Sequence, residues 1–131
     1  MIERILIMVV CVLLSAYFSA TETAFSSANK TRLKAMAEKG NKRAKLAFRL
    51  SEDYDHLISS ILIGNNIVNI ALASIGTLVF VDIWGHSGAT ISTIVITIVV
   101  LIFGEITPKS VAKDIPEQFA MFSAPFINLL M

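Results

Sequence analysis

Residues 57–81 read LISSILIGNNIVNIALASIGTLVFV and carry no charged side chain. A helix of that length is about 37 Å long, enough to cross the roughly 30 Å hydrocarbon core of a bilayer. Three asparagines, Asn65, Asn66 and Asn69, lie close to the middle of this stretch. We therefore expect a membrane-spanning helix over 57–81 that carries polar groups at depth.

The composition of the whole chain agrees with a membrane protein. Of its 131 residues, 55% are hydrophobic and 16% are charged, and the mean hydropathy is +0.72. Soluble domains carry about a quarter charged residues, so disorder, a nucleic-acid-binding domain and an ordinary soluble enzyme are disfavoured. The single cysteine, Cys11, allows no intramolecular disulfide. We expect one all-α integral membrane domain over residues 1–131.

Apolar runs on both sides of 57–81 predict two more spans, at about 3–27 and at 88–110. The last apolar piece is too short to cross a bilayer and predicts a juxtamembrane helix over 114–131. Basic residues concentrate in 29–56, and the segment between the second and third spans has no Lys or Arg. The positive-inside rule therefore places the N-terminus outside and the C-terminus in the cytoplasm. Because the basic cluster follows the first run, we expect an uncleaved helix and not a signal peptide.

The cytoplasmic segment predicts a helical hairpin. Asn29 can cap a helix that runs to Glu38, Gly40 can end that helix, and Asn41 can cap a second one. Apolar residues at i, i+3 and i+4 predict one packed face in each helix. The charged face is then expected to meet solvent and lipid head groups.

Asparagines inside a membrane span need partners, because an unpaired amide in hydrocarbon costs free energy. Asn65 and Asn69 are four residues apart and share a helix face. Two interpretations stay open. The amides either hold helices together, at roughly 0.6–2 kcal/mol for each hydrogen bond, or they form a polar binding site.

The third span ends in GEITPK at 104–109, which is unusual for the end of an apolar helix. Pro108 has no N–H, so the carbonyl of Gly104 loses its α-helical donor. A freed carbonyl beside the Glu105 carboxylate is a pair of hard oxygen donors, which suits Mg²⁺ or Ca²⁺. The alternative is a helix end with a breaking proline and a glutamate that reaches the interface.

The first span ends with further oxygen donors. Ser19, Glu22 and Thr23 share a helix face by their spacing, although side chains of this kind often bond to their own helix backbone. In the predicted topology Ser19, Asn65 and Glu105 can meet in the inner half of the membrane. Their hydroxyl, amide and carboxylate oxygens suit a hard cation better than zinc or copper.

These motifs resemble the transmembrane, DUF21-type domain of the CorB/CorC and cyclin M (CNNM) family of magnesium transport proteins. They are FSATETA at 18–24, LIGNNIVN at 62–69 and FGEITPK at 103–109, in the order and spacing of that family. The resemblance implies a homodimer in the lipid bilayer with three transmembrane helices and a juxtamembrane helix in each protomer. It also implies Mg²⁺ export, with Na⁺ as the coupling ion.

Carried over to this chain, the resemblance implies Mg²⁺ ligands at Ser19, Asn65, Gly104 and Glu105. The motif positions expected to support them are Glu22, Thr23, Asn66, Asn69, Pro108 and Lys109. Family members continue into cytoplasmic CBS domains, and this sequence stops at Met131 inside an apolar stretch. We therefore expect a chain truncated before those domains.

The resulting expectation is a magnesium transport domain in a cell membrane. No nucleophile–base pair or cofactor-binding loop is visible, so we expect no enzymatic activity. The alternative is a non-transporting module that anchors or dimerises a cytoplasmic sensor. In that alternative, replacing Asn65 loosens the dimer and removes no cation-dependent property.

Overall fold

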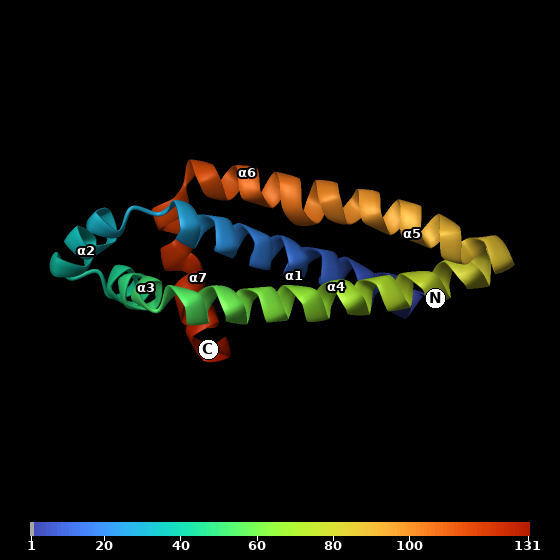
Figure 1. The fold of residues 1–131 in the computed structure, drawn as a ribbon, viewed down its shortest axis with the longest axis horizontal. Helices are drawn as coiled ribbons and strands as arrows, with labels where there is room; N and C mark the ends of the chain where they lie inside the picture. The colour runs from blue at the N-terminus through green and yellow to red at the C-terminus, as the bar shows by residue number, and fades with distance from the viewer. Residues whose placement is uncertain (1) are drawn as a thin grey trace.

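The computed structural model describes residues 2–131, and every regular element in that range is helical (Figure 1). In chain order the elements are α1 (Ile2–Ser27), α2 (Lys30–Glu38), α3 (Lys42–Glu52), α4 (Tyr54–Trp84), a 3₁₀ turn η1 (Gly85–Ser87), α5 (Gly88–Val99), a π-helical segment η2 (Val100–Ile106), α6 (Thr107–Asp114) and α7 (Pro116–Leu130). The prediction of an all-α chain is confirmed.

Three long helical rods form the body of the molecule: α1, α4 and the continuous rod α5–η2–α6. In Figure 1, α1 lies between the other two and contacts α4 on one side and η2 and α6 on the other. α4 ends at Trp84, and the next residue, Gly85, has a φ of 68°, in the left-handed region. The chain reverses there, so that α5 runs back along α4 (Figure 1). A Cβ at Gly88 would collide with the backbone of Phe80, so this tight reversal also requires glycine at that position.

Two helical stretches are long and apolar enough to cross a membrane, α1 and the stretch 54–114 that comprises α4, α5 and α6. Large apolar side chains on these helices face outward; Ile63, Ile67 and Ile70 of α4 are 61%, 63% and 67% exposed. Extended apolar surface of this kind marks a membrane or partner contact. α4 extends three residues beyond the predicted 57–81 at each end.

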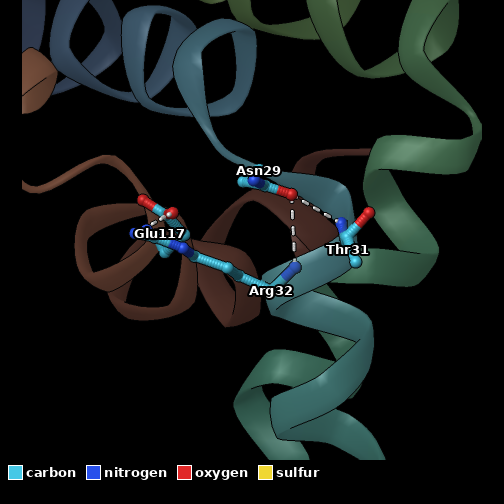
Figure 2. Close-up of polar contacts among 4 residues, drawn as sticks. All are labelled: Asn29, Thr31, Arg32 and Glu117. Carbon is cyan, nitrogen blue, oxygen red and sulfur yellow. Dashed lines mark hydrogen bonds and ion pairs between the residues drawn. The ribbon is translucent and has the colours of Figure 1, made fainter.

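The hairpin α2–α3 follows its predicted capping residues. The side chain of Asn29 accepts hydrogen bonds from the backbone N–H groups of Thr31 and Arg32, at 2.9 and 3.3 Å (Figure 2). Asn41 caps α3 in the same way, accepting from a backbone N–H at 3.1 Å. Gly40 separates the two helices with a φ of 99°. Both predicted caps are therefore confirmed.

α7 crosses the rods at the end where the α2–α3 hairpin begins, and it contacts α1, α3, α4 and α6 (Figure 1). Its buried face joins a core cluster that includes Phe18, Phe25, Leu57 and Ile127. An ion pair of 3.4 Å between Arg32 Nη1 and Glu117 Oε1 links the hairpin to the start of α7 (Figure 2). The predicted last helix is thus packed against all three rods.

Candidate functional site

A buried hydrogen bond connects the first and second rods at the level of the predicted polar residues. Ser15 of α1 donates from Oγ to Oδ1 of Asn65 on α4, at 3.1 Å. The two side chains are 0% and 9% exposed. A hydroxyl and an amide, both enclosed by apolar helices, therefore satisfy each other across two segments that are far apart in the sequence.

The third rod meets the same pair through Gly104. A Cβ built on this buried glycine would lie 3.1 Å from Ser15 Oγ, tighter than an ordinary van der Waals contact. The absence of a side chain therefore allows the η2 backbone to approach the hydroxyl. Ser15, Asn65 and Gly104 bring α1, α4 and η2 to one point.

The backbone around Gly104 is a π-helix and not the simple proline break that the sequence predicts. The N–H of Thr107 donates to the carbonyl of Ile102, five residues back, and Pro108 has no N–H to donate. The carbonyls of Phe103 and Gly104 thus lose their usual α-helical donors. π-helical turns occur frequently at functional sites.

The three asparagines of α4 have different surroundings. Asn65 is buried in the bundle, whereas Asn66 is exposed on the outer surface of α4. The Oδ1 atom of Asn69, one turn beyond Asn65, is buried and has no hydrogen-bond partner within residues 2–131. An unsatisfied buried acceptor costs about 1–3 kcal/mol, so this oxygen is available to a ligand or to a partner chain.

The other predicted residues lie on α1, η2 and α6. Ser19 is 1% exposed and lies one turn after Ser15, but the hydrogen bond to Asn65 in the described chain comes from Ser15. Thr23 and Pro108 are buried, and Glu22, Glu105 and Lys109 are half-buried. Within residues 2–131 no three His, Cys, Asp or Glu side chains gather into a cluster.

Sequence reasoning missed Ser15. The available signal was its spacing, because Ser15 precedes Ser19 by four residues and therefore lies on the same face of α1. That spacing alone gave no reason to prefer Ser15 over other small residues of the span. Its contact with Asn65 depends on how α1 and α4 pack.

Hydrogen bonds connect the face of α1 around Tyr17 to α7. Tyr17 donates from its hydroxyl to the carbonyl of Ser123 at 3.3 Å, and the hydroxyl oxygens of Thr21 and Ser123 are 3.2 Å apart, within hydrogen-bond distance. Tyr17 also packs edge-on against Phe126 of α7, with ring centroids 5.3 Å apart. α1 is therefore fixed both to α4 and to the helix that crosses the rods.

Comparison with known proteins identifies the family to which this sequence is similar. A family model described as the cyclin M transmembrane N-terminal domain matches residues 6–131. The chain is 44% identical over 126 residues to a UPF0053 protein of Haemophilus influenzae, a match that covers 96% of this chain and 30% of the relative. It is 45% identical over 122 residues to the UPF0053 inner membrane protein YfjD of Escherichia coli, with 90% and 28% covered.

A more distant match extends the comparison to plants. A chloroplastic DUF21 domain-containing protein of Arabidopsis thaliana is 38% identical over 119 residues, with 90% of this chain and 18% of the relative covered. The chain spans less than a third of the length of each of these relatives. The matched motifs, the helical fold and the family model together show that the chain is a membrane domain that belongs to the cyclin M transmembrane N-terminal domain family.

Proposed function

We propose that this chain is the membrane domain of a magnesium transport protein and that it binds Mg²⁺ as the transported substrate between α1, α4 and η2. The proposed ligands are Ser19, Asn65, Gly104 and Glu105. The observation that carries the proposal is the convergence of the second and third motifs at one buried point on α1, where Ser15 lies against both Asn65 and Gly104.

The donor chemistry supports a hard cation. Mg²⁺ prefers near-octahedral oxygen ligands at about 2.0–2.1 Å and gives up its water reluctantly. This region offers hydroxyl, amide and backbone carbonyl oxygens, with the Glu105 carboxylate to compensate charge. The unpartnered Oδ1 of Asn69 adds a buried acceptor that a cation, or a water bound to it, would satisfy.

The proposed path uses three membrane crossings, N-terminus outside and C-terminus inside, with the α2–α3 hairpin in the cytoplasm. Eight basic side chains between residues 30 and 49 support this orientation. Irregular backbone at a binding site between spanning helices is typical of transporters that work by alternating access, and η2 supplies such backbone here. Export, exchange for Na⁺, a homodimer and cytoplasmic CBS domains are proposed by analogy with the family.

The alternative function, a membrane anchor or dimerisation module, is favoured by one observation. The Ser15–Asn65 hydrogen bond is by itself the interhelical contact that a purely structural asparagine would make. The unpartnered oxygen of Asn69 fits both functions, because a cation would pair its Oδ1 atom at a binding site and a second protomer would pair it in a dimerisation module.

Thermal unfolding of the detergent-purified chain over a Mg²⁺ series tests the proposal. A cation that binds only the folded state raises the midpoint with concentration, by about 2.7 kcal/mol of added stability at 100 times its Kd. We expect this rise with Mg²⁺ and a smaller one with Ca²⁺. Glu105→Gln should abolish the rise, whereas Glu52→Gln, at an exposed carboxylate of α3, should retain it. A midpoint that is independent of Mg²⁺ up to 10⁻² M, roughly tenfold above the weakest physiological cation sites, would favour the anchor.

A further inference from the structure

We propose that Ser15 is a further oxygen ligand of the cation site, in addition to the four residues that the motifs indicate. This inference rests on the proposed function, because it assigns one more ligand to the same site. Ser15 lies outside all three motifs, in the apolar part of α1, and its side chain is completely buried. Its position relative to Asn65 and Gly104 suggests the role.

The hydrogen bond that Ser15 makes leaves its oxygen available. A serine hydroxyl has one proton and two acceptor lone pairs. Ser15 donates its proton to Asn65 Oδ1, so both lone pairs remain free to face a cation, and Asn65 Oδ1 has a second lone pair of its own. A hydroxyl that binds a cation points its proton away from the ion, so cation binding would exchange this hydrogen bond for coordination by the same two oxygens, which the bond holds side by side until then.

The separation of the two oxygens is compatible with two ligands of one magnesium ion. Neighbouring ligand oxygens in an octahedron with metal–oxygen distances of 2.0–2.1 Å are about 2.8–3.0 Å apart. Ser15 Oγ and Asn65 Oδ1 are 3.1 Å apart. The pair is thus held close to the spacing of two adjacent Mg²⁺ ligands.

Other hydroxyls of the helices behave differently. Seven of them donate to the backbone carbonyl four residues back in their own helix: Thr21, Ser26, Ser51, Ser60, Thr77, Thr93 and Thr97. Two of them, Thr21 and Ser26, also contact a hydroxyl of another helix. The hydrogen bond of Ser15 goes to a side chain 50 positions away on another rod and not to the carbonyl four residues back.

Gly104 keeps the third side of this hydroxyl open. A side chain at position 104 would begin 3.1 Å from Ser15 Oγ and would cover it. With glycine there, the oxygen faces the η2 backbone directly, where the carbonyls of Phe103 and Gly104 have lost their α-helical donors. Ser15 is therefore the residue at which α1, α4 and η2 meet.

Two substitutions at position 15 separate a ligand from a packing residue. Ser15→Ala removes the oxygen and should weaken Mg²⁺ binding tenfold or more, measured by the concentration that half-saturates the rise in unfolding midpoint. Ser15→Cys, made in a Cys11→Ala background so that no thiol stands one turn away, should weaken Mg²⁺ and strengthen binding of the thiophilic ion Cd²⁺. Ser92, a buried hydroxyl of α5, provides the matched controls Ser92→Ala and Ser92→Cys, which should change neither affinity.

The outcomes distinguish this inference from the proposed function. Loss of Mg²⁺ affinity in Ser15→Ala together with a Cd²⁺ gain confined to Ser15→Cys supports the ligand. Unchanged Mg²⁺ affinity in Ser15→Ala, when Asn65→Ala loses it, overturns the role of Ser15 and leaves the cation site intact. No Mg²⁺-dependent rise in the unsubstituted chain overturns both. If Ser15→Ala does not fold, Ser15→Cys decides alone, and no gain in Cd²⁺ affinity overturns the ligand.

Discussion

The two ends of the three-rod bundle are built from different kinds of contact. At the α4–α5 turn the rods approach through glycines: a Cβ on Gly76 would lie 3.1 Å from Ile96 of α5 and 3.4 Å from Met8 of α1. Towards the α7 end, glycine contacts recur at Gly64 and Gly104, and buried hydrogen bonds such as that from Ser15 to Asn65 join the rods as well. Close apolar packing stabilises a fold and tolerates exchange among apolar side chains of similar size, whereas a polar contact requires particular donor and acceptor atoms. We therefore expect substitutions at the first end to act on stability, and substitutions at the second end to act on the proposed cation binding as well.

The largest expected effect is at the packed end. Gly88→Ala places a methyl group against the backbone of Phe80, which cannot move without opening the turn. We expect a loss of about 3 kcal/mol or more, measured by chemical unfolding in detergent and followed by circular dichroism. Ala89→Ser, at an exposed neighbour, should stay within about 0.5 kcal/mol. A fully stable Gly88→Ala variant would show that the turn is looser than described.

Gly104→Ala tests the polar end by the same addition of one methyl group. The new atom meets a side chain at 3.1 Å, and Ser15 can adjust where the backbone of Phe80 cannot. We expect a loss of about 1–2 kcal/mol, smaller than at Gly88, together with weaker stabilisation by Mg²⁺. Equal losses at the two glycines would contradict the contrast between the ends.

Asn65→Ala removes the buried hydrogen bond between α1 and α4. Interhelical hydrogen bonds in membrane proteins average about 0.6 kcal/mol, so the stability change should be modest. The Mg²⁺-dependent rise in the unfolding midpoint should nevertheless disappear. Asn66→Ala is the control, because Asn66 is exposed on the outer surface of the same helix. A loss of Mg²⁺ response in both variants would mean that the site is not confined to the inner face.

The smallest effect is expected for the ion pair at the packed end. Arg4 Nη1 and Asp82 Oδ2 are 2.6 Å apart, with side chains 44% and 54% exposed. Exposed pairs contribute about 0–1 kcal/mol and weaken as salt rises. A double-mutant cycle of Arg4→Gln and Asp82→Asn at low and high salt measures the coupling. Exposed ion pairs contribute at most about 1 kcal/mol. A coupling well above that value would make this pair a main stabilising contact between α1 and α4.

The sequence predicted those features that depend on neighbouring residues. Asn29 and Asn41 each cap a helix because a cap needs only its own side chain and the next turn. The long helices follow from uncharged runs of 17 to 25 residues, at 5–21, 57–81 and 83–104. In both cases the cause lies within a few positions along the chain.

The parts that the sequence did not predict depend on packing between distant segments. Periodicity placed Asn65 and Asn69 on one face but could not identify Ser15 as the group opposite Asn65. Pro108 predicted a break in the pattern of helical hydrogen bonds. Whether the helix then kinks or widens into a π-helix depends on the neighbouring rods. The reason for glycine at position 104 likewise depends on the position of α1, because a side chain there would meet Ser15.

The π-helical segment also has a consequence for comparing relatives. A π turn holds one residue more than an α turn, so every side chain after Ile106 is rotated by about 100° compared with an uninterrupted helix. Pro108 and Ala112, which are buried, would turn away from the bundle if one residue were deleted from η2. In an alignment of homologues, a single-residue gap between positions 100 and 106 would therefore signal a change of buried face and not merely a shorter helix.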